Sequence, residues 1–246
     1  MRNLLLTIFS LLLLAACTNT APRTKHSALA EADSLMHTHP DSALALLQSI
    51  SADSLTDDAN RAYHALLLSQ ALDKNYIDKT DDSLINIAVA YYAKRKLSRE
   101  YFLSLYYKGR ILRNAGEYPK AMLAYVEAEK YKDFPDNAYL VGLLYKQLGN
   151  LHYEYCDYPK SLSAYELAST YFAEASKNQH YAFCLYDIAN VYRQMLNIKA
   201  SEKMYLKAMD KAKTISYTYL YNASICGLFM LYVEFDMQEK ADSLYR

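Results

Sequence analysis

The chain has 246 residues, with 27 basic and 27 acidic side chains, so its formal net charge is zero. A balanced charge removes the long-range attraction to phosphates that non-specific nucleic-acid binding requires, so no nucleic-acid partner is expected. The hydrophobic share of 52% is that of a globular chain rather than a disordered one. Only 5 glycines are present, which is too few for the turns of a β-sandwich or for a phosphate-binding loop. The composition therefore predicts an all-α fold.

The N-terminal segment, 1–16, has the pattern of a secretory signal peptide. Met1-Arg2-Asn3 provides a positive start, and residues 4–14 form an almost unbroken apolar stretch. This stretch is too short for a hydrocarbon core that needs about 20 residues, which disfavours the alternative of a permanent transmembrane helix. We therefore expect residues 1–16 to be removed after export.

The sequence Leu14-Ala15-Ala16-Cys17 resembles the lipobox of bacterial lipoproteins. The resemblance implies that Cys17 becomes the first mature residue and carries lipid on its thiol and its amine, which would attach the chain stably to a membrane. Residues 17–26 then form a polar tether. Residue 18 is Thr rather than Asp, which resembles sorting to the outer membrane, so we expect an exported protein in the cell envelope that faces the periplasm.

Two helix pairs with a weaker pattern are predicted between residues 27 and 98. Apolar residues recur at helical spacing over 28–37 and 43–50, with Pro40 in the connecting turn. The next pair covers 62–72 and 84–94, and residues 73–82 are predicted to form the loop between its helices.

A repeat with a period of about 40 residues is clear over 99–246. It is marked by four tyrosines: Tyr125, Tyr165, Tyr205 and Tyr245. Small residues follow the same step: Gly109, Gly149 and Ala189, and then Ala121, Ser161, Ser201 and Ala241. Small residues let helix axes approach closely while tyrosines fill the space between successive pairs. The pattern predicts antiparallel helix pairs stacked in a right-handed solenoid of about eleven helices, with Pro119 and Pro159 at the starts of two of the second helices.

The last unit of the repeat is incomplete. A helix over 219–235 is followed by only about two helical turns, whereas the end of a solenoid needs a polar cap. We expect either that the chain is a piece of a longer protein or that another protein surface covers Phe229, Leu244 and Tyr245.

Residues 145–153, Tyr-Lys-Gln-Leu-Gly-Asn-Leu-His-Tyr, followed by Asp157-Tyr158-Pro159-Lys160-Ser161-Leu162, resemble the tetratricopeptide repeat (TPR). The resemblance is good over 99–246 and implies a TPR-like array over 27–246. The period is longer than the usual one of about 34 residues. In this it is similar to the longer-helix repeats of kinesin light chains and some bacterial peptide-sensing regulators. His152 departs from the pattern, because an aromatic residue is usual there.

In TPR arrays, ligands usually lie along the first helices of successive pairs, which would form the concave face of the solenoid. Carrying that pattern onto this chain selects nine residues at the repeat step: Tyr106, Arg110, Arg113, Lys146, Asn150, Tyr153, Tyr186, Asn190 and Arg193. Arg and Lys pair with carboxylates, Asn can hold a peptide backbone, and Tyr offers flat contact area. We therefore expect a protein or peptide partner with acidic groups. The alternative for Asn150 and Asn190 is a hydrogen bond across neighbouring first helices.

A carboxylate clamp of the kind that binds chaperone tails is disfavoured. Lys146 and Asn150 have suitable spacing, but Phe183 and Asp187 stand where that clamp has further polar and basic residues.

Motifs of common enzymes are missing, including HExxH, GxSxG, SxxK, GxxxxGKS/T and GxGxxG. His37-Thr38-His39 and His152 have no carboxylate or thiol at ligand spacing, so we expect no metal and no cofactor. Cys156, Cys184 and Cys226 are an odd number without CxxC spacing and are expected to be buried, unpaired thiols.

These features predict a lipid-anchored, non-enzymatic adaptor or scaffold that binds another polypeptide. The alternative is the sensory input module of a TPR-containing transcriptional regulator, of which this chain would be a truncated piece. A carbohydrate-handling enzyme is disfavoured because no pair of carboxylates predicts a catalytic cleft.

Overall fold

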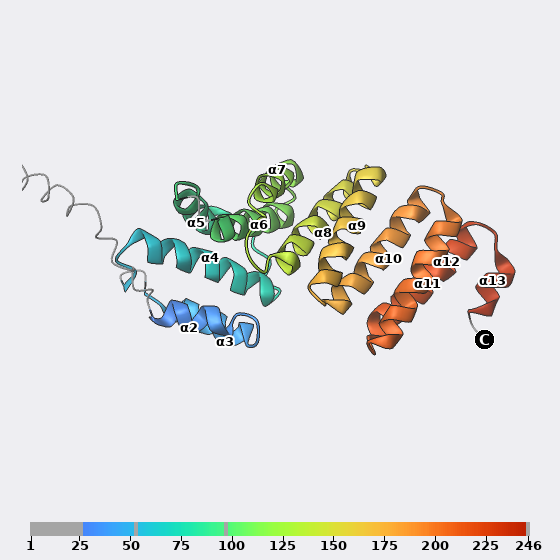
Figure 1. The fold of residues 1–246 in the computed structure, drawn as a ribbon, viewed down its shortest axis with the longest axis horizontal. Coiled ribbons are helices and arrows are strands. Elements are labelled where there is room, and N and C mark those ends of the chain that lie inside the picture. The colour runs from blue at the N-terminus through green and yellow to red at the C-terminus, as the bar shows by residue number, and fades with distance from the viewer. Residues whose placement is uncertain (1–26, 52–53, 96–97, 245–246) are drawn as a thin grey trace, which may run out of the picture.

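The computed structural model describes residues 27–51, 54–95 and 98–244, and within these ranges it has twelve α-helices and no strand. The helices are α2 (Ser27–Leu35), α3 (Pro40–Ser49), α4 (Asp58–Lys74), α5 (Ser83–Ala93), α6 (Ser98–Asn114), α7 (Tyr118–Glu129), α8 (Ala138–Glu154), α9 (Tyr158–Glu174), α10 (Asn178–Gln194), α11 (Ile198–Thr214), α12 (Thr218–Glu234) and α13 (Gln238–Ser243). They form an elongated row from α2 to α13 (Figure 1). The all-α prediction is confirmed. The predicted signal peptide, the tether with Cys17, and Tyr245 lie outside the described residues.

The helix starts follow the repeat step. The first helices of five pairs, α4, α6, α8, α10 and α12, begin at positions 58, 98, 138, 178 and 218, and each has 17 residues. The second helices α7, α9, α11 and α13 begin at 118, 158, 198 and 238. Pro119 and Pro159 lie in the first turn of α7 and α9, where a missing N–H costs no helical hydrogen bond. The predicted period is confirmed, and in the first helices it extends upstream to α4.

The first helices from α6 to α12 end in the same local structure. Each is followed by a residue in the left-handed region with φ between 53° and 75°: Gly116, Cys156, Leu196 and Asp236. The next amide then donates to a carbonyl of the last turn, as Asp157 N does to His152 O at 2.8 Å. This Schellman arrangement satisfies the end of the helix and reverses the chain, so the second helix can run antiparallel to the first.

The pair α4 and α5 departs from this regularity. α4 extends through Lys74, so the predicted loop over 73–82 is corrected to 75–82. α5 begins at Ser83, whereas the repeat step would place its start at position 78. The longer connection leaves space beside α4 and α6, which becomes a cavity described below.

Contacts run along the row of helices. Extensive contacts join helices that follow one another in the chain, or alternate ones such as α4 with α6 and α10 with α12. A stack in which each pair rests on its neighbours is a solenoid, as predicted. The twelve described helices compare with the prediction of about eleven.

The repeated tyrosines fill notches that the small residues leave on the first helices. The Tyr125 and Tyr205 side chains are 0% exposed, and Tyr165 is 4% exposed. A Cβ atom added at Gly149 would lie 2.6 Å from the Tyr165 ring, and one added at Gly109 would collide with Tyr125. Glycine is required at these two positions because the ring occupies the volume of a side chain.

The small residues of the second helices are buried beside the same notches. Ala121, Ser161, Ser201 and Ala241 are at most 1% exposed, as is Ala189 on α10. The Ser161 hydroxyl donates to the Gly149 carbonyl at 2.9 Å, and the Ser201 hydroxyl donates to the Ala189 carbonyl at 2.9 Å. In these two pairs a hydrogen bond therefore ties the helices together, whereas Ala121 and Ala241 keep only the small size at the same interval.

The prediction that all three remaining cysteines are buried is wrong for two of them. All three are free thiols, but only Cys184 is buried, whereas Cys156 and Cys226 are exposed. Cys156 occupies the left-handed turn after α8, which projects from the pair, and Cys226 lies on an outward side of α12. In the last unit, α13 has 6 residues, and Phe229 and Leu244 pack partly buried beside the core of that unit.

Candidate peptide-binding surface

Three successive first helices build a hollow of about 310 Å³. We call it the first-helix hollow. Its lining residues come from α6, α8, α9 and α10: Arg113, Asn150, Tyr153, Glu154, Tyr165, Asp187 and Asn190. Four of the nine residues predicted from the sequence are among them. The repeat step produces this convergence, because it places equivalent positions of neighbouring first helices on the same side of the solenoid.

The two asparagines are held by tyrosines of their own repeat. Tyr165 donates its hydroxyl hydrogen to Asn150 Oδ1 at 2.8 Å, and Tyr205 donates to Asn190 Oδ1 at 2.5 Å. The alternative of hydrogen bonds between neighbouring first helices is therefore corrected: the tyrosine partners stand on the second helices. Since both amide oxygens accept these bonds, the Nδ2 groups are the donors that remain. Asn150 Nδ2 already makes a long hydrogen bond to Gln147 Oε1 at 3.5 Å, which uses one of its two N–H groups, and Asn190 lines the hollow from α10.

Burial keeps these tyrosines protonated. Desolvation raises the pKa of Tyr165 and of Tyr205 far above the usual value, so both remain hydrogen-bond donors at any physiological pH.

Three of the four predicted cations form ion pairs within the chain. Arg110 Nε and Nη2 each lie 2.8 Å from Asp73 Oδ1. Lys146 Nζ lies 3.1 Å from Asp187 Oδ2 and 4.9 Å from the centre of the Phe183 ring. These contacts explain why Asp187 and Phe183 stand beside Lys146, and they leave Lys146 without the free charge that a carboxylate clamp needs.

The third pair joins Arg193 Nη1 and the Glu234 carboxylate at 3.6 Å, although Arg193 Nε has no hydrogen-bond partner of its own. Arg113 is the exception. Within the described residues it forms no ion pair, and its Nε atom is buried without a hydrogen-bond partner. Arg113 is therefore the predicted cation whose charge is left for a ligand.

The predicted tyrosines differ in exposure. Tyr106 is 4% exposed and packs edge to face on Tyr107 with ring centres 5.1 Å apart, so its assignment to the ligand-contacting surface is corrected to the core. Tyr153 is half-buried, lines the hollow and contacts Tyr158. Tyr186 is half-buried against Tyr205, with ring centres 5.6 Å apart.

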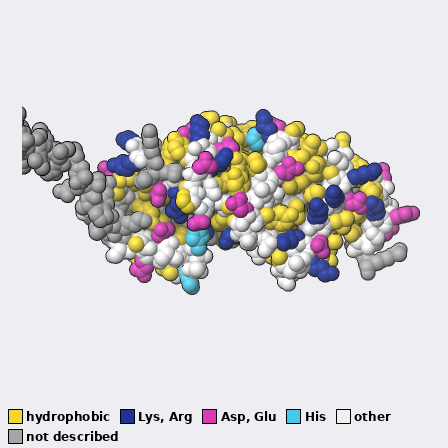
Figure 2. Space-filling model, in the orientation of Figure 1, with side chains coloured by type: hydrophobic (Ala, Val, Ile, Leu, Met, Phe, Trp, Pro, Cys, Tyr) yellow, Lys and Arg dark blue, Asp and Glu magenta, His cyan; other side chains and the backbone are white. Residues whose placement is uncertain are grey.

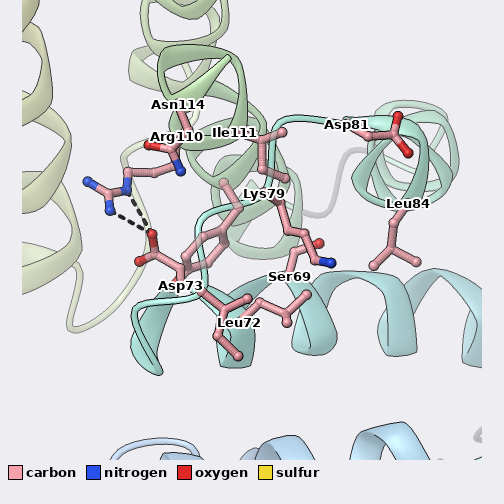
Figure 3. Close-up of a pocket in the computed structure, with 11 residues that line it drawn as sticks. Ser69, Leu72, Asp73, Lys79, Asp81, Leu84, Arg110, Ile111 and Asn114 are labelled. Atoms are coloured by element: carbon pink, nitrogen blue, oxygen red, sulfur yellow. Dashed lines mark hydrogen bonds and ion pairs between the residues drawn. The ribbon is translucent and has the colours of Figure 1, made fainter. Parts of the chain in front are cut away.

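A second cavity, of about 190 Å³, lies under the connection between α4 and α5 (Figure 3). Its lining residues are Ser69, Leu72, Asp73, Ile77, Lys79, Asp81, Leu84, Tyr107, Arg110, Ile111 and Asn114. Figure 3 shows the Arg110 and Asp73 pair at one side of it. Sequence reasoning selected Arg110 but missed the cavity. The sequence signal nearest to it is the predicted loop over 73–82, which interrupts the 40-residue repeat between the two helices of this pair.

The described residues contain no group of three or more His, Cys, Asp or Glu side chains placed to hold a metal ion. His39 Nδ1 contacts the neighbouring Thr38 hydroxyl at 3.1 Å, and His152 Nδ1 lies 3.9 Å from Asp157. In the same described ranges, none of the helices combines the length and the hydropathy needed to cross a membrane. Figure 2 shows basic and acidic side chains interspersed over the visible face, without an extended patch of one sign.

No protein-family model and no curated protein matches the chain. Solved structures do. One is a Signal Transduction ATPase with Numerous Domains protein with a tetratricopeptide repeat sensor from Pyrococcus horikoshii, with a TM-score of 0.71, 14% identity, and coverage of 88% of this chain and 34% of that one. A Rap protein complexed with Competence and Sporulation Factor gives a TM-score of 0.65 and 17% identity, over 89% of this chain and 63% of that one.

TPR-like repeats described as those of a kinesin light chain, from Podosopora anserina, give a TM-score of 0.54 and 15% identity, over 76% of this chain and 95% of that one. The chain spans about a third of the Pyrococcus protein and about three fifths of the Rap protein. Identities this low bear on the fold alone. Together with the helix register and the notched packing of tyrosines on small residues, they establish that the chain has the fold of a TPR-like helical-repeat array.

Proposed function

We propose that this chain is an exported protein, tethered to a membrane by lipid on Cys17, which binds another polypeptide through the first-helix hollow. The observation that carries the proposal is the convergence of polar side chains from α6, α8 and α10 on one hollow. The similar Rap protein was solved with Competence and Sporulation Factor, and the shared fold supports a binding role here as well.

The mechanism is preorganisation of the binding surface. Ion pairs and tyrosine hydrogen bonds hold Asn150, Asn190 and Asp187 in place before a ligand arrives. Side chains that are already ordered lose little conformational entropy on binding, so more of the contact energy appears as affinity. An extended peptide segment that crosses the three first helices would meet amide donors and the Tyr153 ring along its length.

The alternative function is a sensory input module of a longer regulator. The specific observation that favours it is the likeness to a protein with a TPR sensor, of which this chain covers 34%. Genomic DNA beyond the codon for Arg246 distinguishes the two functions. An in-frame continuation with an apolar stretch of about 20 residues favours the sensor, and intergenic DNA favours the free-standing adaptor.

Blocking the hollow is expected to abolish partner capture. A chain of residues 17–246 without lipid is used to capture proteins from envelope extract, and the captured proteins are quantified by mass spectrometry. Glu154→Trp places a large ring at the exposed last residue of α8, on the rim of the hollow, and should reduce capture at least tenfold. The matched control is Glu174→Trp, at the exposed last residue of α9 and outside the hollow. Equal capture by the two variants would contradict the proposal.

Lipid attachment is tested separately. Cys17→Ala should move the protein from the membrane pellet to the soluble fraction, because the acyl chains supply the membrane affinity at about 0.8 kcal/mol per buried methylene. Fractionation after a carbonate wash measures the effect. Pelleting of the Cys17→Ala protein after that wash would show that lipid on this cysteine is not the anchor.

A further inference from the structure

Most of the predicted cations on the first helices are paired with an acidic side chain of the chain itself, and Arg113 is the exception. Two of the internal pairs join residues 41 positions apart, Lys146 with Asp187 and Arg193 with Glu234. Glu154 stands 41 positions after Arg113 and could have completed the same pattern. No ion pair joins these two residues in the structure, although both line the first-helix hollow.

The repeat that contains Arg113 differs from the next two repeats in the partner of its buried tyrosine. Burial raises the pKa of Tyr125 and of Tyr165, and the charge of Arg113 opposes both shifts. The Tyr125 hydroxyl is buried without a hydrogen-bond partner, unlike those of Tyr165 and Tyr205. The reason is local: the position of Asn150 and Asn190 is taken in this repeat by Arg110, which is paired with Asp73.

An unneutralised guanidinium at this place is a strong anion receptor. Arginine stays charged at all relevant pH values, and its planar donors match the two oxygens of a carboxylate. The buried Nε–H has lost its contact with water and gained no acceptor from the chain. The guanidinium as a whole lines the hollow and forms no ion pair within the described residues, so a ligand carboxylate would bind its Nη groups without displacing an existing partner.

The other charged groups at the hollow limit what the ligand can be. Asp187 forms an ion pair with Lys146 at 3.1 Å, which offsets its charge, although its Oδ2 atom makes no hydrogen bond. Glu154 is exposed at the end of α8, where water screens its charge, so it competes only weakly with an incoming anion. Asn190 Nδ2 and the N–H of Asn150 Nδ2 that is not directed to Gln147 Oε1 remain as donors for peptide carbonyl oxygens.

We infer that the partner is an extended peptide segment with a Glu or Asp side chain whose carboxylate binds Arg113 in the first-helix hollow. This inference rests on the proposed function and adds the chemistry of the ligand. An acidic side chain, rather than a chain terminus, is assigned because the hollow continues across three helices and places Asn190 on α10 beyond Arg113 on α6.

The first test needs no ligand. Arg113→Met removes a buried donor that has no partner, so the urea midpoint of the free protein should stay unchanged or rise. The matched control is Arg193→Met, 80 positions later in the same register, which breaks the pair with Glu234 and should lower the midpoint. A lower midpoint for Arg113→Met than for Arg193→Met would overturn the inference, because it would show that Arg113 already has a stabilising partner within the chain.

The second test uses immobilised libraries of C-amidated octapeptides with a central Glu or a central Gln, and the central-Gln library with a free C-terminus. The chain of residues 17–246 should be retained at least tenfold more on the Glu library. Arg113→Met should lose this preference, Arg193→Met should keep it, and Glu154→Gln should increase it by removing the competing carboxylate. Equal retention on Glu and Gln, no retention on any library, or a preference for the free C-terminus would each overturn the inference.

These outcomes are distinguishable from failure of the proposed function. If envelope capture remains sensitive to Glu154→Trp while the Glu preference is absent, the hollow binds a polypeptide but Arg113 does not read an acidic side chain. If wild-type protein captures nothing, the proposed function itself fails.

Discussion

Replacing Tyr165 by Ala is expected to lower the free energy of unfolding by about 3–5 kcal/mol, the range for removing a buried aromatic side chain. The ring is 4% exposed and fills the notch at Gly149, which has no side chain to close the resulting cavity. Urea unfolding followed by far-UV circular dichroism measures the change.

The control for Tyr165→Ala is Tyr165→Phe, which keeps the ring and removes only the hydrogen bond to Asn150, at a cost of about 1 kcal/mol. Because each pair rests only on its neighbours, the Ala variant should also make the transition broader, as the two halves of the array begin to unfold separately. A loss below about 1 kcal/mol for the Ala variant would show that this ring is not part of the core.

The sequence was sufficient to predict the packing of the tyrosines, because a steric requirement restricts which residue types can occupy the facing positions of each repeat. A ring of constant size needs a small residue opposite it in every unit, so Tyr125 with Gly109 and Tyr165 with Gly149 recur at one step. The same repeat also predicts where the helices begin, since the first helices α6, α8 and α10 have the same length and start 40 residues apart.

The state of each charge could not be predicted in the same way. The repeat places Arg110, Arg113 and Arg193 on one side of the solenoid, and from the sequence alone they are equivalent. Their roles depend on side-chain geometry between units. Arg110 forms an ion pair with Asp73 and Arg193 forms one with Glu234, whereas Arg113 forms no ion pair within the described residues. An acid at a suitable spacing is not sufficient, as Glu154 demonstrates.

The cavity beneath residues 75–82 also escaped prediction, for a different reason. It arises where the repeat is broken: the sequence predicts a long loop there, but whether side chains fill the space beneath a loop depends on packing that no periodic pattern records. The residue types in this connection also do not indicate the turn that follows α4. The left-handed position after α4 is held by Tyr76, a residue type with no preference for that conformation.

Replacing Lys146 by Met should have the second large effect, a loss of about 2–4 kcal/mol of unfolding free energy at pH 7, because removing one partner of a buried ion pair leaves the other charge unpaired. The side chains of Lys146 and Asp187 are 22% and 20% exposed, so some water contact remains, which places the expected loss below that of a fully buried pair. Methionine keeps most of the aliphatic volume, so the change reports chiefly on the charge.

The pH dependence identifies Asp187 as the cause. Burial raises the pKa of Asp187 above its usual value, and Lys146 opposes that shift. A carboxyl group whose pKa is higher in the folded state stabilises the fold below its unfolded pKa, and this contribution is lost as the pH rises through the folded pKa. Without Lys146 the folded pKa rises further, so the deficit of the variant should be largest at pH 7 and should shrink as the pH is lowered toward 4.

A second substitution completes the argument. Asp187→Asn in the Lys146→Met background replaces the unpaired charge by a neutral amide and should recover most of the lost stability at pH 7, with little remaining dependence on pH. Chemical unfolding of the single and double variants at pH 4.5 and pH 7 provides the measurement. A deficit that is the same at both pH values, or that persists in the double variant, would show that Lys146 stabilises the solenoid through its packing against Phe183 and not through Asp187.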